Sequence, residues 1–467
     1  MMNLLTKTYA PVYRNLVFPV YEGILRHRGI YRYYRDLSES TAIPREKLRE
    51  MQRKKLNELL VYCDANVPFY RELFSLRGVD PHKVFDIETL RERGIFTSKA
   101  ITRSAGESIL SREFARDKLH NSATSGSTGT PVLFHMTHDN WCLRMALKYR
   151  SEDWIGKPLG TPATLIWGHK PGQTRSMRLK SSLYWRFQNY QFISAFDIGE
   201  DRLLDGIAAI KGFGSRFIES YVTVVYLMAR LIEKYRIEPP KLDGIIAGAE
   251  KLFDFQKEQI ERSFRCPVFN RYGATEFSNV ASECEKREGL HINMDTLWVE
   301  VVDDDERPVT GTAGNIVITD LGNRAMPLIR YKIGDKGVLT DRICSCGRTF
   351  PMLKEIVGRV SETLKTEDGH EIHDMYFLWK LSRAPGLVKF RVVQDSLTHI
   401  RVEIEHDGVI DRELTSRWIR DALKDLEQYH VANTLEYVDT IPLTGAGKMR
   451  FFVSELAGGT RRLEQNT

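Results

Sequence analysis

Strand-like and helix-like segments alternate between residues 164 and 272, and this alternation limits the fold more than any other feature of the chain. Short apolar runs typical of buried strands occur at 164–168, 190–196, 217–221, 242–250 and 267–272. Helical patterns follow two of these runs, at 222–235 and 253–264. Strands that alternate with helices form layers, with helices covering a largely parallel sheet. We therefore expect an α/β fold with a large layered N-terminal domain.

The segments outside this region differ in character. At 44–63 the pattern predicts an amphipathic helix whose apolar face is formed by Leu48, Met51, Leu56, Leu59 and Leu60. After residue 296, short strands and turns predict a smaller β-rich subdomain, and the final segment predicts a small α+β domain. Since 467 residues are too many for one ordinary core, we divide the chain into a helical, basic arm with the start of the large domain (1–117), the large domain (118–357) and a small C-terminal domain (358–467).

The positive charge of the chain is concentrated at its beginning. Residues 1–55 hold 12 Lys and Arg against 5 Asp and Glu, whereas the whole chain has a net charge of +6. A solvated basic helix face is the simpler interpretation, and peripheral contact with an anionic membrane or an acidic partner is the alternative. No basic stripe runs through the body of the chain, so we expect no nucleic-acid partner. The oligomeric state cannot be read from the sequence.

Targeting features are sparse. No apolar run reaches the length of about 18 residues that a membrane-spanning helix needs, and we expect no signal peptide. Six cysteines are few for this length, which favours a reducing compartment over a disulfide framework. We therefore expect a cytoplasmic protein.

The stretch TSGSTGTP at 124–131 has the composition of a phosphate-binding loop. Glycine leaves backbone N–H groups accessible to a ligand, and the hydroxyl groups add further donors. A P-loop is excluded because its lysine is missing. By composition alone such a stretch is more often a flexible turn, so the decision depends on the other motifs of the chain.

Two further motifs carry groups suited to a nucleotide. RYGATE, at 271–276, follows a predicted strand, and the carboxyl ends of strands bind ligands in α/β sheets. There Thr275 can donate to a phosphate, Glu276 can hold a magnesium ion and Tyr272 can cover a flat ring. In LIRYKIGD, at 328–335, Asp335 can accept hydrogen bonds from both hydroxyls of a ribose, although a turn aspartate is the alternative.

A lysine on a glycine-rich loop lies near the C-terminus. PLTGAGKMR, at 442–450, carries Lys448. This side chain is either a solvated surface charge or a point charge that meets a developing phosphate anion.

Together and in this order, the motifs resemble the adenylate-forming superfamily of acyl-CoA synthetases, over about residues 118–452. TSGSTGTP is similar to its phosphate loop, RYGATE to its YGxTE motif, YKIGD to its ribose-binding motif and PLTGAGKMR to its catalytic lysine motif. GRVSE, at 358–362, resembles its hinge, and Gly248-Ala-Glu250 the segment that lines the adenine. The N-terminal VPFYRELF, the compact C-terminal domain and a cysteine pattern resemble the phenylacetate–CoA ligase branch, which includes CapK-like proteins encoded with capsular polysaccharide genes.

The resemblance implies ATP-dependent activation of a small carboxylic acid to an acyl-adenylate, followed by transfer to a thiol, most often that of coenzyme A, in polysaccharide or secondary metabolism. The small domain would be mobile and would carry the catalytic lysine. The implied catalytic residues are Lys448, Glu276 and Thr275, with Glu276 binding Mg²⁺. The implied nucleotide-binding residues are Thr124, Ser125, Gly126, Ser127, Thr128, Gly129, Gly248, Ala249, Glu250, Tyr272, Gly273, Asp335 and Arg359.

Three cysteines and a histidine form a candidate zinc set, namely Cys284, His291, Cys344 and Cys346. Four protein ligands leave no open position, which is typical of a structural zinc ion. Members of the branch that this chain resembles carry such a site, and four unrelated residues are the alternative. The other three cysteines, at 63, 142 and 266, are expected to be buried small apolar side chains.

Several points stay open. Ser361 lies at the hinge position where many relatives have aspartate or lysine, and its effect on the hinge is unknown. His169 is a candidate cover and Tyr221 a candidate wall of the acid pocket. The acceptor is alternatively a carrier-protein thiol, a sugar or an amine, and the chain is alternatively a non-catalytic binding member of a polysaccharide assembly system. Glu276, Asp335 and Lys448 argue against that last possibility. The sequence does not identify the carboxylic acid.

Overall fold

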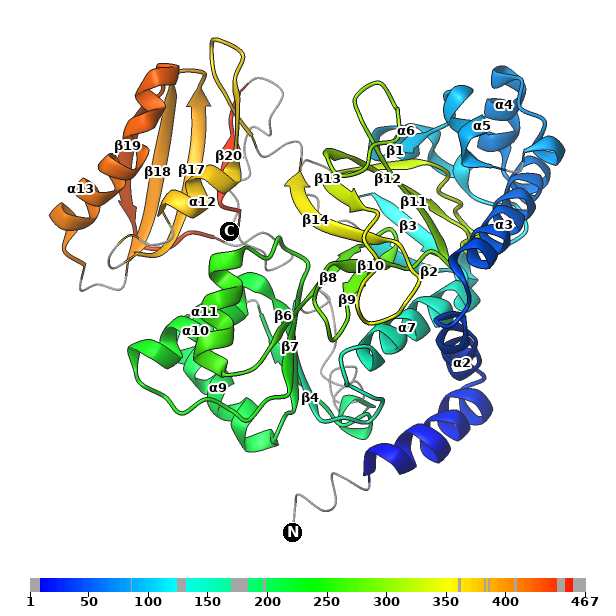
Figure 1. The fold of residues 1–467 in the computed structure, drawn as a ribbon, viewed down its shortest axis with the longest axis horizontal. Coiled ribbons are helices and arrows are strands. Elements are labelled where there is room, and N and C mark those ends of the chain that lie inside the picture. Colours follow the sequence, from blue (N-terminus) through cyan, green and yellow to red (C-terminus); the bar gives the residue numbers. More distant parts are fainter. Residues whose placement is uncertain are drawn as a thin grey trace. The chain divides into compact units, whose positions relative to one another are not determined.

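The computed structural model describes residues 9–84, 86–123, 132–168, 184–195, 199–359, 363–381, 384, 387–406, 410–442 and 450–456. These residues form two compact units (Figure 1), one up to Gly358 and one from Arg359 onward. No helix within these ranges combines the length and the apolar character that crossing a lipid bilayer requires.

In the first unit, most of the described strands form a 12-stranded sheet with a parallel half and a largely antiparallel half. The parallel strands are adjacent in the order β5 (Tyr190–Ser194), β4 (Ala163–Trp167), β6 (Phe217–Tyr221), β7 (Gly244–Gly248) and β8 (Val268–Ala274). The helices α9 (Glu200–Phe213), α10 (Val222–Lys234) and α11 (Asp254–Phe264) contact these strands. Parallel strands covered in this way are largely buried and mostly apolar, as the runs in the sequence predicted. The predicted α/β fold is confirmed.

The β-rich region belongs to the same sheet. It continues from β8 through β9 (Ser278–Glu283), β10 (Leu290–Ile292), β14 (Met352–Arg359), β13 (Tyr331–Thr340), β12 (Ala313–Asp320) and β11 (Leu297–Val302), and β1 (Thr97–Ser98) pairs with β13. A separate hairpin, β2 (His120–Ala123) and β3 (Leu133–Met136), flanks the TSGSTGTP stretch.

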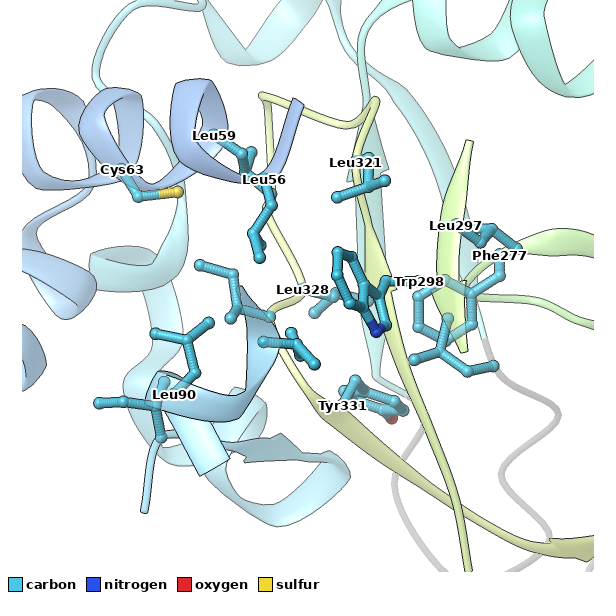
Figure 2. Packing of buried hydrophobic residues seen from close by; sticks show 14 of the residues in the cluster. Leu56, Leu59, Cys63, Leu90, Phe277, Leu297, Trp298, Leu321, Leu328 and Tyr331 are labelled. Carbon is cyan, nitrogen blue, oxygen red and sulfur yellow. The ribbon is translucent and has the colours of Figure 1, made fainter. Parts of the chain in front are cut away.

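Helices before residue 160 cover the β-rich strands and pack on one another. They are α2 (Ile30–Ser40), α3 (Arg45–Asn66), α4 (Pro68–Arg77), α5 (Ile87–Glu92), α6 (Lys99–Ala105) and α7 (His138–Asp153). Figure 2 shows Leu56 and Leu59 of α3 facing Trp298 and Leu328 in one apolar core.

The predicted apolar face of α3 needs one correction. Met51 is 41% exposed, and Gln52 is buried instead. The Gln52 side-chain amide donates a 2.7 Å hydrogen bond to the carbonyl oxygen of Leu297. The buried stripe runs through positions 48, 52, 56, 59 and 60, and position 51 lies about 60° outside its edge on the helix circumference. A hydrogen-bonded glutamine side chain is therefore buried where the hydropathy pattern predicted methionine.

The second unit has a small sheet with the order β19 (Ala432–Val438), β18 (His399–His406), β17 (Leu387–Ser396) and β20 (Phe452–Ser454). Two α-helices, α12 (Asp374–Leu381) and α13 (Arg412–Leu423), the 3-10 helix η6 (Lys424–Tyr429) and the hairpin of β15 (Thr363–Lys365) and β16 (Glu371–His373) complete the described part. The Asp411 carboxylate caps α13 by accepting from the backbone N–H groups of Glu413 and Leu414. The unit has the predicted α+β character.

Candidate functional site

The carboxyl ends of four parallel strands bring several predicted residues to one edge of the sheet. β4 ends at Trp167, β6 at Tyr221 and β7 at Gly248. Tyr221 is paired in register with Gly248, and Gly248 with Arg271 at the start of RYGATE. Parallel strands present their carboxyl ends on the same side, which is where ligands bind in α/β sheets. The predicted adenine segment and RYGATE are therefore neighbours.

A hydrogen bond joins the two predicted nucleotide motifs. The Tyr272 hydroxyl on β8 donates to Asp335 Oδ2 on β13 over 2.8 Å. Three strands lie between β8 and β13 in the sheet, so a flat sheet would hold them about 19 Å apart. The contact therefore requires the sheet to bend sharply. It places the residue predicted to cover the adenine beside the residue predicted to bind the ribose.

Glu276 is held from two sides within the first unit. Its Oε1 lies 3.2 Å from the Tyr331 hydroxyl, and its backbone oxygen accepts from Arg144 Nη2 at 2.6 Å. Arg144 in turn pairs with Asp320 at 2.9 Å. The Glu276 side chain is buried, while Thr275, in the turn from Ala274 to Phe277, is exposed. A buried, oriented carboxylate beside an exposed hydroxyl is suited to a phosphate-bound cation.

Backbone approach explains two residues of the predicted site. A Cβ on Gly273 would lie 2.4 Å from the carbonyl oxygen of Ser278, so the hairpin between β8 and β9 closes only around glycine. A Cβ on Gly248 would lie 3.0 Å from the carbonyl oxygen of Arg271. Ala249 has a φ of 64°, a left-handed conformation that directs the chain into the turn after β7.

Glu250, predicted to line the adenine, has a structural contact as well. Its Oε2 accepts a 2.7 Å hydrogen bond from the backbone N–H of Thr223, in the first turn of α10. An acidic group at that end of a helix stabilises the helix. The contact fixes the turn after β7 against the neighbouring helix.

An aromatic pair lies at the same edge of the sheet. The rings of Trp167 and Tyr221 stack with their centroids 4.3 Å apart, and the backbone N–H of Gly168 donates to the Tyr221 hydroxyl at 3.3 Å. Burial raises the pKa of Tyr221, so the hydroxyl stays protonated. A flat apolar wall with one polar edge results.

A buried ionic cluster beneath this edge was not predicted from the sequence. Glu219 on β6 pairs with Lys148 at 2.6 Å and with Arg271 at 2.8 Å. Glu152 pairs with Lys157 and lies 3.5 Å from Arg271. Burial alone would raise the pKa of Glu219, but the charges of Lys148 and Arg271 outweigh it and hold the pKa at about 2. The cluster fixes the start of RYGATE to β6 and α7.

The four predicted zinc ligands come together in the first unit. Cys284 follows β9, His291 lies on β10, and Cys344 and Cys346 precede β14. Their ligand atoms all lie within 4.8 Å of one another. Backbone N–H groups of Lys286 and Arg348 each lie 3.4 Å from a cysteine sulfur and can donate to it.

The spacing of these atoms fits a tetrahedral zinc ion. Cys284 Sγ and Cys344 Sγ are 3.6 Å apart, and Cys346 Sγ and His291 Nε2 are 3.4 Å apart. Zinc with ordinary Zn–S and Zn–N bonds separates such ligand pairs by about 3.8 Å and about 3.6 Å. Burial lowers the pKa of His291 to about 4, so its imidazole is neutral, as a metal ligand must be. The donor set fits a closed structural site.

Several predicted residues lie outside the described residues. They are Thr124, Ser125, Gly126, Ser127, Thr128, Gly129, Lys448, His169 and Ser361. Arg359 ends β14, and its side chain is also outside the description. The other three cysteines, Cys63, Cys142 and Cys266, are buried as expected.

Comparison with known proteins gives a consistent result. Residues 364–455 match the family described as the CapK C-terminal domain. Protein CapK of Staphylococcus aureus is 23% identical over 463 residues, which cover 98% of this chain and 100% of that protein. The phenylacetate-coenzyme A ligase of Thermus thermophilus is 29% identical over 385 residues, which cover 80% of this chain and 82% of that protein.

A solved structure shares the fold. The 2-hydroxyisobutyryl-CoA ligase, in its postadenylation state with a bound acyl-AMP, aligns with a TM-score of 0.73 over 89% of this chain and 91% of that chain, at 17% identity. At that identity the likeness concerns the fold alone. Taken with the two relatives, the matched C-terminal domain and the ordered motifs, it supports the CapK- and phenylacetate–CoA ligase-like branch of the adenylate-forming superfamily as the group that this chain resembles.

Proposed function

We propose that the chain is an AMP-forming acid–thiol ligase that activates a carboxylic acid with ATP and transfers the acyl group to the thiol of coenzyme A. In the first step a carboxylate oxygen attacks the α-phosphorus of ATP and pyrophosphate leaves. In the second step the thiol sulfur attacks the acyl carbon, AMP leaves and the thiol proton is released. The similarity to proteins named phenylacetate-coenzyme A ligase and 2-hydroxyisobutyryl-CoA ligase supports this reaction class.

The observation that carries the proposal is the contact between Tyr272 and Asp335. An aromatic ring and a carboxylate held side by side can take the two halves of a nucleoside, with the base against the ring and the ribose hydroxyls on the carboxylate. Gly248, Ala249 and Glu250 lie on the adjacent strand end and would enclose the base. Arg359 would assist at the ribose.

The phosphates are assigned to groups around RYGATE and TSGSTGTP. Thr275 would contact the α-phosphate, and Glu276 would hold Mg²⁺, which offsets the charge that develops on the leaving pyrophosphate. Thr124, Ser125, Gly126, Ser127, Thr128 and Gly129 would hold the β- and γ-phosphates. Lys448 would neutralise the carboxylate and the α-phosphate during adenylation. A protein can catalyse phosphoryl chemistry of this kind largely by positioning and charge.

The acid is assigned to the wall that Trp167 and Tyr221 form. A stacked aromatic pair favours an acid with a flat or apolar body. The metal set is assigned to a structural Zn²⁺ that ties the end of β9 to the segment before β14. It would orient the antiparallel strands next to β8 without contacting a reactant.

The proposal is tested by product analysis. Purified protein is incubated with ATP, Mg²⁺ and one member at a time of a panel of aryl, fatty, amino and hydroxy acids, and acyl-AMP is detected by mass spectrometry. Coenzyme A, a carrier-protein phosphopantetheine thiol, an amine or a sugar is then added. The expected result is acyl-AMP with one class of acid and a thioester on addition of coenzyme A. If coenzyme A leaves the acyl-AMP unchanged and another acceptor consumes it, the assignment of coenzyme A as the acceptor is wrong.

The first step has its own matched pair of variants. Glu276→Gln is expected to lower acyl-AMP formation strongly, since a neutral amide holds a magnesium ion weakly. Glu72→Gln, which changes an exposed glutamate on α4, is expected to leave it unchanged. Equal acyl-AMP formation by the two variants would remove Glu276 from the proposed site.

A further inference from the structure

A row of exposed apolar side chains lies along the helical segment that precedes α2. This segment comprises η1 (Tyr13–Val17) and η2 (Pro19–Leu25), both with the wide turn of a π-helix. Val12, Leu16, Val20 and Ile24 recur every four residues, and Leu25 adjoins the last of them. Their exposed fractions run from 39% to 66%. Because a π-helix has a little over four residues per turn, the row follows one face, here called the outer apolar face.

The opposite face of the same segment is buried in the first unit. Tyr13, Phe18 and Glu22 are buried completely or nearly so. The Glu22 carboxylate accepts from Arg28 at 3.1 Å and from the Tyr184 hydroxyl at 2.8 Å. These contacts fix the segment by its inner side, so the outer apolar face cannot turn into the core. A helix that is apolar on both faces is normally covered on both.

The surroundings of the outer apolar face are basic. From residue 9 to residue 39 the chain has five arginines and three acidic residues, of which Glu22 is buried and paired with Arg28, while Asp36 and Glu39 lie 3.6 Å and 3.9 Å from Arg35. An open groove of about 570 Å³ adjoins the face, since Pro19 and Gly23 of the same segment line it. Its other lining includes His27, Arg28, Arg32 and Arg35, against one acidic group, Asp139. Apolar side chains and a cationic groove thus occur on one short stretch of surface.

We propose that this surface docks on an anionic lipid bilayer, with the outer apolar face at the acyl boundary and the arginine-lined groove at the lipid phosphates. Interfacial helices bind membranes by this combination of an apolar face with flanking Lys and Arg. Each basic side chain near an anionic leaflet adds to the attraction. A symmetric pairing of two copies fits less well, because it would bring the same cationic surface against itself. The inference goes beyond the ligase activity and does not depend on it.

The test is flotation of the full chain with vesicles at low and high salt. One vesicle type is phosphatidylcholine alone, and the other contains phosphatidylglycerol as well. The protein is expected to float with the anionic vesicles at low salt, less so at high salt, and not with the neutral vesicles. Failure of the wild-type protein to float with the anionic vesicles would overturn the proposal.

Two variants and a matched control locate the surface. The double change Leu16→Glu with Ile24→Glu is expected to weaken binding to anionic vesicles by at least about tenfold. Leu76→Glu, at an exposed leucine of α4, alters the same kind of side chain elsewhere and is expected to have no effect. Arg32→Glu with Arg35→Glu is expected to weaken binding while removing most of its salt dependence. Unchanged melting temperatures show that the variants are folded.

Two results would overturn the proposed partner. Equal flotation of the wild-type protein and the Leu16→Glu, Ile24→Glu variant would show that the outer apolar face does not meet the lipid. A wild-type dimer that ignores vesicles and that the same double change converts to a monomer would assign the face to a second copy of the chain.

Discussion

The Tyr272 hydroxyl donates to Asp335 Oδ2 over 2.8 Å, although 63 residues separate the two in the chain. The bond connects β8 with β13 across a bent sheet and joins the motifs RYGATE and YKIGD. Neither residue needs the other for its local structure, because each lies within its own strand. The contact brings the two motifs together, and the proposed nucleotide pocket depends on it.

Replacement of these two residues is expected to separate their roles. Asp335→Asn removes the charge that would bind the ribose hydroxyls, so ATP affinity should fall about tenfold to a hundredfold, the value of a hydrogen bond to a charged group. Tyr272→Phe keeps the ring, so ATP affinity should fall by less than about tenfold. Calorimetric titration with ATP measures both. Asp341→Asn, at an exposed aspartate just beyond β13, is the control, and equal ATP affinity of Asp335→Asn and this control would contradict the ribose assignment.

The glycine of RYGATE provides a steric test. In Gly273→Ala the new methyl group would lie 2.4 Å from the carbonyl oxygen of Ser278, and a backbone oxygen cannot move aside easily. The free energy of unfolding should fall by about 1–3 kcal/mol. Gly212→Ala, in α9 with open space around the position, should be neutral or slightly stabilising. Urea unfolding measures both, and a fully stable Gly273→Ala would show that the hairpin relaxes without cost.

The metal set predicts a stability effect. The protein is expected to contain about one zinc ion per chain, and Cys346→Ser or removal of zinc by a chelator should lower the melting temperature on the order of 5 °C or more. Elemental analysis and thermal unfolding measure the two quantities. Cys266→Ala, at a buried cysteine outside the set, should keep the zinc. Full zinc content in Cys346→Ser would contradict the assigned ligands.

The buried ionic cluster predicts how stability depends on pH. The pKa of Glu219 is about 2 in the folded protein and about 4.3 when unfolded, so its stabilisation is present above about pH 4.3 and is lost as the pH falls towards 2. The loss should be on the order of 3 kcal/mol. In Glu219→Gln the curve of unfolding free energy between pH 5 and pH 2 should be flatter. A curve as steep as that of the wild type would show that other carboxyl groups cause the acid sensitivity.

At neutral pH the same replacement is expected to be destabilising. Glu219→Gln leaves Lys148 and Arg271 with fewer counter-charges in a buried place, which should cost about 3 kcal/mol. Glu413→Gln, at an exposed position of α13, should change stability little. Urea unfolding at pH 7 compares the two variants.

Hydrophobic periodicity predicted the strands of the parallel half of the sheet well, and it predicted α9, β9 and β10 poorly. β6 begins and ends at the predicted residues, and all five of its positions are buried, including the polar Glu219 and Ser220. α9 was not predicted, since Gly206 and Gly212 lower its helical propensity. Gly206 packs closely against α10, since a Cβ there would lie 2.9 Å from the terminal methyl group of Met228. β9 and β10 were not predicted either, because buried Asn279, Ser282 and His291 interrupt the hydropathy pattern.

The sequence singled out residues of the candidate site and not their arrangement. Motifs identified Tyr272, Glu276 and Asp335, but only the order of the strands shows which of them meet. Tyr331, which holds Glu276, lies four residues before Asp335 on β13. The pairing of β13 with β12 shifts register between them and Gly334 has a φ of 86°, so regular strand alternation could not have shown that both side chains reach the same site. Nothing in the sequence indicated the partners of Arg271, since Glu219 and Glu152 belong to distant elements.

The most direct test of the central claim is ATP–pyrophosphate exchange driven by a carboxylic acid. Wild-type protein is expected to exchange label with one class of acid. Lys448→Ala should lower that exchange about a hundredfold or more while ATP still binds, and Lys424→Ala, at an exposed lysine of the second unit, should exchange normally. Wild-type protein that binds ATP but exchanges with no acid across the panel would contradict the account, and normal exchange by Lys448→Ala would remove the lysine from it.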